Sequence, residues 1–529
     1  MIPSKINNYN QVNNHDDFLA QTKMIFLSFP LNLCAFGRKN YQMKNFLKLL
    51  SVGLIIFSFS CNNEVSQEKP RVIILTDMTH DDGNSFIRYL YYAPWFDLEA
   101  LIVTNQLPDF NYDDNDPWGK AMGILDAYKQ ELPQLRKHDP GFPDYEELMA
   151  VTKRGRGSIP IIWLTNSLEF KGHIADRYAE SSWDSIYFHD WIGEGLNPNG
   201  EPKDSEGSEF LQQVFDKDDD RPIYVQAWGG PITFIQALYR YKQRKGAEEF
   251  EKLLSKLHVY GILFQDITFD YLIDLQKVKD LNCTNFGTAT FTYEGERGAP
   301  RWLLHDSGHF WRYVGGSDPV MRRSEVNGHG PMSNLYDNGG EGDTPAFLYL
   351  LSSVLGLNNP EDPTQGSWGN MFYPMGNDFP EGYYHTCFHE KDELVRWIPD
   401  VKKSYLNRLQ WSVKEPDEVN HAPFAIVNNN KTNRILTIQA KPGEKIKLDA
   451  SKSFDPDGND IRFNWFRYKA ADSFQGELEI SSPENAMQTV MVPSNLAGQE
   501  IHLVLEVRDN GTPDLVSYRR VIIKNKDDA

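Results

Sequence analysis

Short runs of branched apolar residues alternate with amphipathic stretches of helix length between residues 71 and 415. The apolar runs predict buried strands, because they are short, rich in Val and Ile, and bounded by polar residues. They lie at residues 72–76, 98–104, 159–165, 222–228 and 257–264, and helical spacing recurs at 85–92, 119–128, 232–244 and 344–355. Strands that alternate with helices predict an α/β domain, with a parallel sheet covered on both faces. Ligands of such sheets bind at the carboxyl ends of the strands.

The pattern changes to period-two alternation after about residue 415. Apolar and polar positions alternate, with turns rich in Gly, Pro, Asp and Asn, at residues 442–466, 489–493, 500–511 and 517–524. This pattern predicts a small all-β sandwich with an immunoglobulin-like fold. The turn Asp455-Pro456-Asp457-Gly458 resembles a loop of the polycystic-kidney-disease type of immunoglobulin fold, with Trp465 as the expected core residue. We interpret the aspartates of this turn as turn-forming residues, with a calcium loop as the alternative.

The amino-terminal segment has the pattern of an export signal. Lys44 and Lys48 precede an apolar run at residues 49–59, and Cys61 follows this run after Ser60. This order is typical of a signal peptide, and the run is short of the about 20 apolar residues that a membrane helix needs. Cys61 resembles the acylated cysteine of a bacterial lipoprotein. We therefore expect an exported protein, periplasmic or on the cell surface, whose membrane contact is a lipid anchor at Cys61; plain cleavage and an uncleaved segment are the alternatives.

These patterns divide the chain into five expected segments. They are an extension that precedes the true start at 1–42, a signal peptide at 43–60, a linker at 61–70, the α/β domain at 71–415 and the sandwich at 416–529. Cys283 and Cys387 remain in the mature chain besides Cys61. Their spacing does not form a metal-type pair, and whether they form a disulfide stays open.

Composition narrows the class of ligand. The chain has 529 residues, 40% of them apolar, and its 54 basic and 74 acidic side chains give a formal charge of −20. The apolar content is sufficient for a sizeable core. Nucleic-acid binding depends on Lys and Arg that neutralise phosphates, so we expect no nucleic-acid partner. Neutral or cationic ligands fit this charge better, as does a metal bound by carboxylates.

Three carboxylates gather where the first predicted strand passes into a helix, at Asp77, Asp81 and Asp82. Helix N-termini favour negative charge by about 0.3–1 kcal/mol per group, and Asp is a good N-cap, so one or two of the three could serve as caps. A third carboxylate in the same small space would experience like-charge repulsion. Calcium, which accepts irregular sets of oxygen ligands, would remove that repulsion. The spacing alone leaves capping and metal binding equally open.

The spacing Asp77-x-x-x-Asp81-Asp82 resembles the aspartate cluster of the inosine-uridine nucleoside hydrolase superfamily. Further pieces similar to that family follow in the expected order, namely a second strand that ends in Asn105, the turn at residues 228–233 and the segment at residues 341–348. The resemblance spans residues 71–357. The remainder, including the sandwich, resembles a bacterial subfamily described as cellulose-binding, nucleoside hydrolase-like proteins.

The resemblance implies a set of roles for these residues. Asp77, Asp82, Asp343 and the carbonyl of Gly229 would ligate a calcium ion that also holds two neighbouring hydroxyls of a furanose ring. Asp77 would in addition act as general base on a water that attacks the anomeric carbon. In this scheme Asp343 must lie beside the pair near residue 80.

Five residues are candidates for contacting substrate. The resemblance implies that Asp81 and Asn105 hydrogen-bond the sugar hydroxyls. Trp228 ends a predicted strand, so its indole is expected to face the site. His80 lies between the aspartates and either contacts the ligand or lies on an exposed turn. Glu341 belongs to the late segment that carries the last metal ligand.

Departures from the parent family leave two functions open. Leu75 stands where a further Asp often occurs, Met78-Thr79-His80 replaces a Pro-Gly turn, and Gly342 stands where many members carry a His that protonates the leaving group. The first function is a calcium-dependent hydrolase of N-glycosidic or related glycosidic bonds. The second is a carbohydrate-binding, for example cellulose-binding, surface protein with a degenerate hydrolase pocket. The expected ligand is a sugar, a nucleoside or a polysaccharide.

Overall fold

The structure is a computed structural model. It describes residues 68–104, 116–156, 204–262, 301–305, 321–338, 340–377, 379, 381–386 and 393–525, with the backbone alone at His80 and at 301–305. Several sequence predictions fall outside the described residues, namely the signal peptide, the anchor at Cys61, the strand at 159–165, Asn105, Cys283 and Cys387. Within the described part, no helix combines the length and the apolar character that crossing a membrane requires.

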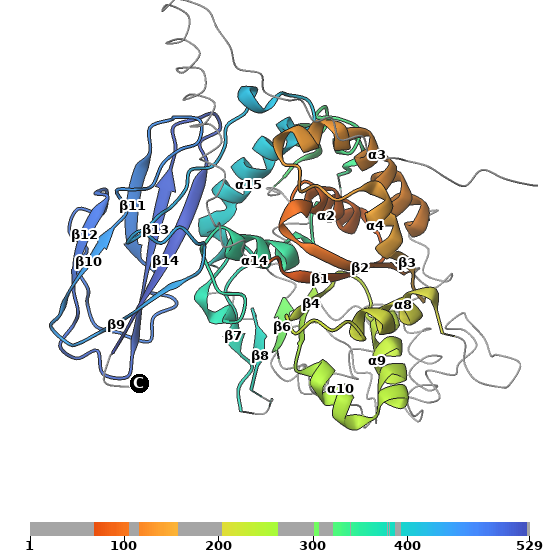
Figure 1. Ribbon diagram of the computed structural model, residues 1–529, viewed down its shortest axis with the longest axis horizontal. Helices are drawn as coiled ribbons and strands as arrows, with labels where there is room; N and C mark the ends of the chain where they lie inside the picture. Colours follow the sequence, from red (N-terminus) through yellow and green to blue (C-terminus); the bar gives the residue numbers. More distant parts are fainter. Residues whose placement is uncertain are drawn as a thin grey trace, which may run out of the picture. The chain divides into compact units, whose positions relative to one another are not determined.

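An eight-stranded sheet forms the centre of the α/β domain (Figure 1). Its strand order is β3-β2-β1-β4-β5-β6-β8-β7, and neighbours pair in parallel except β7 with β8. The bounds are β1 Arg71–Thr76, β2 Asp97–Val103, β3 Thr152–Arg154, β4 Ile223–Ala227, β5 Leu257–Ile262, β6 Arg301–His305, β7 Tyr373–Pro374 and β8 Tyr383–His385. This topology confirms the predicted α/β class. Every residue of β1 is buried, as expected for a parallel strand that is covered on both faces.

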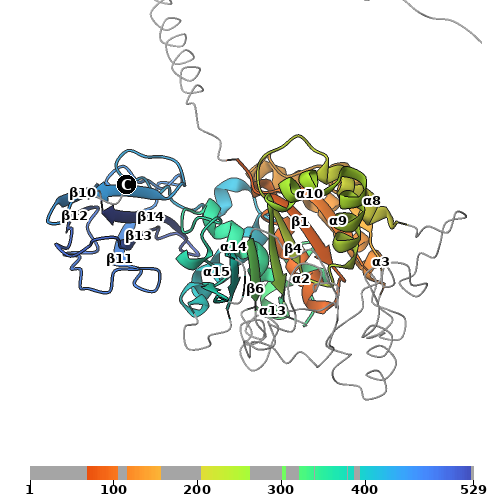
Figure 2. The same ribbon diagram turned by 90° about the horizontal axis from the view of Figure 1, so that it is seen from below.

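Helices cover both faces of the sheet (Figures 1 and 2). On one face lie α2 (His80–Leu90), α3 (Pro117–His138) and α4 (Tyr145–Val151), and on the other lie α8 (Glu206–Phe215), α9 (Ile232–Lys245) and α10 (Ala247–Leu254). The later helices are α13 (Arg323–Val326), α14 (Thr344–Val354) and α15 (Leu394–Gln410), with 3-10 turns η1 (Ala93–Trp95), η5 (Ser333–Leu335), η6 (Pro363–Gln365) and η8 (Pro416–Glu418). Helices α2 and α14 pack together, and the Tyr89 ring meets Phe347 edge-on at a centroid distance of 5.7 Å. This contact fixes the two helices that carry most of the acidic residues described below.

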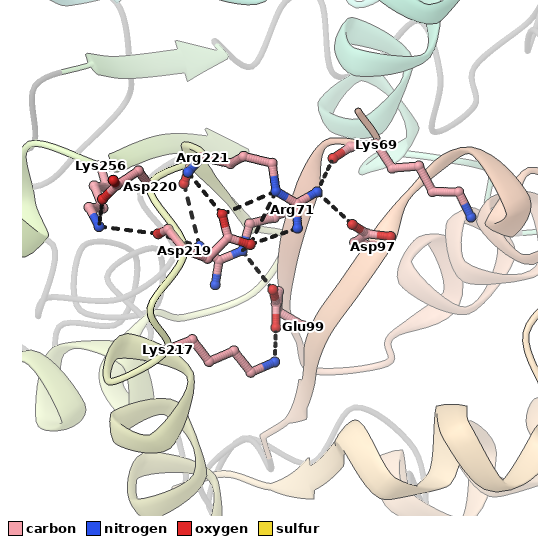
Figure 3. Close-up of polar contacts among 9 residues, drawn as sticks. All are labelled: Lys69, Arg71, Asp97, Glu99, Lys217, Asp219, Asp220, Arg221 and Lys256. Carbon is pink, nitrogen blue, oxygen red and sulfur yellow. Dashed lines mark hydrogen bonds and ion pairs between the residues drawn. The ribbon is translucent and has the colours of Figure 1, made fainter. Parts of the chain in front are cut away.

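A network of ion pairs ties the strands together at the amino end of β1 (Figure 3). Arg71 Nε donates to Glu99 Oε1 at 2.6 Å, which joins β1 to β2. Arg221, which lies just before β4, pairs with Asp97 and with Asp219, each at 2.7 Å. Because the network lies at the sheet edge opposite the carboxyl ends of the strands, we assign it to stability rather than to ligand binding.

The carboxyl-terminal residues form the predicted mostly-β fold. One sheet has two strands, β10 (Lys445–Asp449) and β12 (Met487–Met491), and the other has the order β11 (Arg462–Arg467), β13 (Glu500–Arg508), β14 (Val516–Asn525) and β9 (Leu436–Ala440). Trp465 is buried in the core of these sheets, as predicted. The Asp455 carboxylate accepts hydrogen bonds from the backbone N–H groups of Asp457 and Asn459, at 2.9 and 3.0 Å. These bonds favour the plain-turn interpretation of this loop.

The sandwich shares buried contacts with the α/β domain. The Tyr518 hydroxyl of β14 donates to Asp400 of α15 at 3.0 Å, and its ring meets Trp397 edge-on at 5.5 Å. Arg520 donates to the carbonyl of Leu357 at 2.5 Å. Ser66–Ala529 accordingly form one compact unit. Experiments on either domain alone would remove these contacts, so the tests below use the full chain.

A buried glutamate gives the fold a pH-dependent stability. Glu131 of α3 is 2% exposed, and its carboxylate accepts from the Tyr91 hydroxyl at 2.9 Å and from the Met332 backbone N–H at 2.6 Å. Burial raises the pKa of Glu131 from 4.5 to about 7. Between pH 4.5 and about 7 the Glu131 carboxyl is therefore protonated in the folded chain and ionised in the unfolded chain. The free energy of unfolding falls as pH rises through this range.

Glu131→Gln is expected to remove that part of the pH dependence, because the amide carries no titrating proton and keeps both hydrogen-bonding positions filled. The wild-type chain should lose up to about 3 kcal/mol relative to the variant between pH 4.5 and 7. Urea unfolding at a series of pH values measures the difference, with the exposed Glu248→Gln as the control. A difference that stays constant with pH would contradict the assignment.

Candidate metal centre

The acidic residues lie at the carboxyl end of β1, where the strand order reverses. β1 is flanked by β2 on one side and by β4 on the other, so the chain winds outward in both directions from this pair. A reversal of this kind leaves a crevice at the carboxyl ends of the two strands, in which ligands bind. Asp77 directly follows β1, and Gly229 comes two residues after β4 ends.

The fold brings together carboxylates that are distant in the sequence. Ligand oxygens of Asp81, Asp82 and Asp343 lie within 4.8 Å of one another. Asp81 and Asp82 are in the first turn of α2, and Asp343 is the N-cap residue of α14. The partial positive charges of two helix N-termini therefore converge on one acidic cluster. Asp343 has the position that the predicted calcium site requires of it.

Capping accounts for little of this cluster. The N-cap residue of α2 is Thr79 rather than an aspartate, and the Asp343 side chain makes no capping hydrogen bond to α14. Asp82 is instead fixed through side chains, since it accepts from the Thr79 hydroxyl at 3.0 Å and also from the Thr76 hydroxyl. The helix positions thus hold the carboxylates against one another rather than against backbone N–H groups.

Asp77 approaches the cluster from the strand side. Its backbone N–H donates to Asp82 Oδ1 at 3.2 Å, and its own Oδ1 accepts from the backbone N–H of Thr79 at 3.2 Å. Between them Met78 adopts a φ of 51°, in the left-handed region that favours glycine. The turn that replaces the parent Pro-Gly sequence therefore holds a conformation that is unfavourable for Met, and it places Asp77 beside Asp82.

The carboxylates destabilise one another's charged forms. Burial raises the pKa of Asp82 well above its usual range, and the charges of Asp77 and Asp81 raise it further. Burial, followed by the charge of Asp82, does the same to the pKa of Asp343. The half-buried Asp81 has its pKa raised to about 6, mainly by burial and then by Asp77. A bound cation would reverse each of these shifts by favouring the charged carboxylates.

The donor set fits a hard divalent cation. Both carboxylate oxygens of Asp343 are buried and accept no hydrogen bond from an N–H or hydroxyl group of the described residues. A buried carboxylate without a donor or counter-charge is strongly destabilising. The oxygens of Asp81 and Asp82 face the same space, and a site made of oxygen ligands alone suits calcium or magnesium. The carboxylates of Asp81, Asp82 and Asp343 lie closest together, and the backbone N–H of Asp77 contacts Asp82.

Gly229 is the point of closest approach between β4 and the acidic turn. A Cβ atom built on Gly229 would lie 3.0 Å from the Asp77 backbone nitrogen and 3.3 Å from the Asp77 Cβ atom. Backbone N–H groups of Trp228 and Gly229 both donate to the Leu75 carbonyl, at 2.9 and 3.1 Å. The neighbouring strand ends are thus held together with no room for a side chain at this position.

Gly229→Ala is expected to displace Asp77 and to weaken any stabilisation that calcium provides, because the new methyl group has to push the Asp77 backbone away. The shift in unfolding temperature on adding calcium measures the effect. Gly123→Ala in α3 is the matched control, since a Cβ there meets nothing within 4 Å and Ala favours helix by up to about 1 kcal/mol. An unchanged calcium shift in Gly229→Ala would argue against a role for this close contact.

Two of the predicted substrate residues lie inside the protein. Glu341 is 1% exposed, pairs with Arg88 at 2.8 Å and accepts from the Tyr336 hydroxyl at 2.9 Å. Trp228 is fully buried, and its ring lies 6.4 Å from that of Phe347. In this structure neither side chain presents a surface on which a sugar could stack. Asn105 lies outside the described residues and the side chain of His80 is not described, so their contacts stay predictions.

Asn84 is a positioning residue that the sequence interpretation missed. It lies on α2 one turn after Asp81, and its amide nitrogen donates to the Gly340 carbonyl at 2.7 Å while its oxygen accepts from the Asp337 backbone N–H at 2.9 Å. These bonds hold the loop that leads into Asp343. The helix predicted from the sequence began at residue 85, so Asn84 lay outside it and no sequence signal marked its position.

Comparisons with known proteins identify the family of the chain. Residues 71–372 match the family described as cellulose-binding Sde182, nucleoside hydrolase-like domain, and residues 445–525 match the C-terminal domain of cellulose-binding protein Sde0182. No curated protein matches the chain. A solved nucleoside hydrolase-related protein from Saccharophagus degradans, associated with carbohydrate metabolism, is 28% identical over 87% of this chain and 100% of its own, with a TM-score of 0.65. A plant nucleoside hydrolase is 12% identical over 65% of this chain and 99% of its own, with a TM-score of 0.31.

Proposed function

This chain belongs to the cellulose-binding Sde182, nucleoside hydrolase-like family, and we propose that it is an exported, calcium-dependent hydrolase of N-glycosidic or related glycosidic bonds. The observation that carries the proposal is the convergence of Asp81, Asp82 and Asp343 at the reversal of the strand order, with Asp77 in contact. The buried Asp343 oxygens, which accept no hydrogen bond from an N–H or hydroxyl group of the described residues, support a cation as the missing counter-charge.

The aspartates of the site differ in burial, and this difference fits them to different roles. Asp82 and Asp343 are buried and held by α2 and α14, so they suit the rigid part of a ligand shell. Asp81 is more accessible, so it suits contact with sugar hydroxyls as well as with the ion. A bound calcium ion would neutralise the cluster and increase the acidity of a water molecule in contact with it. Asp77 would accept the proton from that water as it attacks the anomeric carbon, as the base does in inverting glycoside hydrolysis.

An activity screen tests this proposal. Nucleosides and aryl glycosides are incubated with the full chain, with and without a chelator, and product release is measured. We expect turnover that is lost with the chelator and reduced at least about 100-fold in Asp77→Asn, the lower range for loss of a general base. The exposed Asp218→Asn is the charge-matched control. Turnover that persists with the chelator, or in Asp77→Asn, would reject the calcium-dependent mechanism.

A carbohydrate-binding surface protein is the second candidate function. Both matched regions belong to proteins described as cellulose-binding, and Gly342 leaves no side chain beside Asp343 that could protonate a leaving group. In that case the pocket would bind a saccharide without cleaving it. Retention of the full chain on insoluble cellulose, together with no product in the screen above, would favour this function, and no retention would argue against it.

We also propose that the chain is exported and anchored by lipid at Cys61. The basic and apolar segments before this cysteine support the proposal. Labelled palmitate supplied to cells that express the full chain should be incorporated into the wild-type protein and lost in Cys61→Ser. Labelling that remains in Cys61→Ser would contradict the assignment.

A further inference from the structure

A cavity lies at the other end of α14 from the acidic cluster. It has a volume of about 300 Å³ and lies where α15, residues 420–425 and the start of β14 meet. Val354 and Leu355, at the end of α14, line it, whereas Asp343 comes just before the first residue of that helix. Because α14 has 11 residues, its length of about 16 Å separates the two places. The cavity is therefore distinct from the candidate metal centre.

Arg408 of α15 lines this cavity as a buried cation. It is 8% exposed, and its guanidinium lies 3.8 Å from the ring centroid of Trp411 and 4.5 Å from that of Trp95. Contacts of this kind occupy the faces of the guanidinium and leave the N–H donors at its edge. Among the described residues, Nη1 has no hydrogen-bond acceptor and no carboxylate pairs with the side chain.

The other charged side chains that line the cavity have partners. Lys403 pairs with Asp514 at 2.7 Å, and Asp400 pairs with Arg508 at 2.8 Å. Arg408 is thus left as the cavity-lining charge without an ion-pair partner among the described residues, although the charge of the Asp139 carboxylate acts on it. Burial lowers the pKa of Arg408 to about 10, so the group stays charged at neutral pH.

A neighbouring donor points to the same kind of ligand. The Trp411 indole nitrogen, which belongs to a residue lining the cavity, is buried and has no acceptor among the described residues. Buried donors are normally satisfied by an acceptor. A carboxylate offers two acceptor oxygens in a plane, and a guanidinium edge binds it with two parallel hydrogen bonds.

We propose that this cavity binds a carboxylate-bearing ligand of about the size of one sugar ring, with the carboxylate on the edge of Arg408. The volume supports a ligand of that size, since it stands at the lower end of the roughly 300–1,000 Å³ of small-molecule pockets. Lys403 and Asp514, which are 37% and 28% exposed, lie at the cavity as donor and acceptor for hydroxyl groups. The carboxylate can belong to an acidic sugar or to a simple organic acid.

Calorimetric titration of the full chain with glucuronate, glucose and acetate tests the proposal. We expect glucuronate to bind at one site and glucose not to bind. Arg408→Lys should weaken glucuronate binding at least about tenfold, because the ammonium keeps the charge but cannot form paired hydrogen bonds. Ala422→Trp, which places a bulky side chain at a half-buried lining position, should abolish it without altering Arg408.

Controls separate this cavity from the metal centre and from general charge effects. Arg244→Lys, on the exposed part of α9, should leave binding unchanged, and so should Asp343→Asn even if it abolishes hydrolysis. Acetate that binds as tightly as glucuronate would support the carboxylate site and assign it to simple organic acids. Absence of glucuronate binding, equal binding of glucose, or wild-type affinity in both Arg408→Lys and Ala422→Trp would overturn the proposal.

Discussion

Calcium is expected to raise the unfolding temperature of the wild-type chain, and Asp343→Asn is expected to remove that rise. At a free calcium concentration about 100 times the dissociation constant, binding to the folded state alone adds about 2.7 kcal/mol to stability. The Asp343 carboxylate is fully buried, and the two carboxylates that lie within 4.8 Å of it both come from the first turn of α2. Without the Asp343 carboxylate, the remaining aspartates offer a calcium ion an incomplete set of ligands.

The same substitution should have the opposite effect in chelator. Asp343→Asn removes a buried carboxylate whose pKa is raised well above its usual range by burial and by the charge of Asp82, so the metal-free variant should unfold at a higher temperature than the metal-free wild type. Thermal unfolding of both proteins with calcium and with chelator measures the two effects together. Asp218→Asn, at an exposed position between α8 and β4, should behave as wild type. An equal calcium-dependent rise in Asp343→Asn would exclude this residue from the ligand shell.

Arg88→Leu is expected to destabilise the fold by about 3–5 kcal/mol, because it leaves the buried Glu341 carboxylate without its counter-charge. The Arg88 guanidinium pairs with Glu341 at 2.8 Å, and both side chains are almost fully buried. The guanidinium also lies 4.1 Å from the Tyr405 ring centroid, which ties α2 to α15. Urea unfolding at neutral pH measures the loss.

A double substitution separates the charge from the packing. Arg88→Leu combined with Glu341→Leu should recover much of the lost stability, since no unpaired charge then remains in the core. Lys252→Ala, which breaks an exposed pair with Glu249 on α10, should have little effect. If the double variant is no more stable than Arg88→Leu, the lost stability comes from packing around the Arg88 side chain rather than from the unpaired charge of Glu341. Because Glu341 precedes Asp343 by two residues, Arg88→Leu should also reduce the calcium shift.

The strands that surround the site were predictable because their signal is local. Residues 72–76 and 222–228 are short, mostly apolar runs, and the structure places β1 and β4 there side by side. The start of α2 was less accurate, since the predicted helix began at residue 85 whereas α2 begins at His80. Asp81 and Asp82, which precede the predicted helix, are in fact in the first turn of α2, where the helix dipole favours acidic residues.

Long-range polar contacts were beyond the sequence pattern. Arg88 pairs with Glu341, and the Asn84 amide donates to the Gly340 carbonyl. Both contacts join segments that are far apart in the sequence and meet only in the folded chain. The motif resemblance located Asp343 because it carried information about the order of distant pieces. The cavity at Arg408 had no such motif, and its walls come from stretches that lie far apart in the chain, from Trp95 to Ser517.

The most direct test of the central claim is a calorimetric titration of calcium into the metal-free full chain. One ion should bind per chain, and protons should be released, because Asp81, with its pKa raised to about 6, and the more strongly shifted Asp82 must lose any bound proton when the ion enters. Binding should be lost in Asp82→Asn and in Asp343→Asn. No calcium binding by the wild-type chain, or undiminished binding in both variants, would contradict the proposal that these carboxylates form one metal centre.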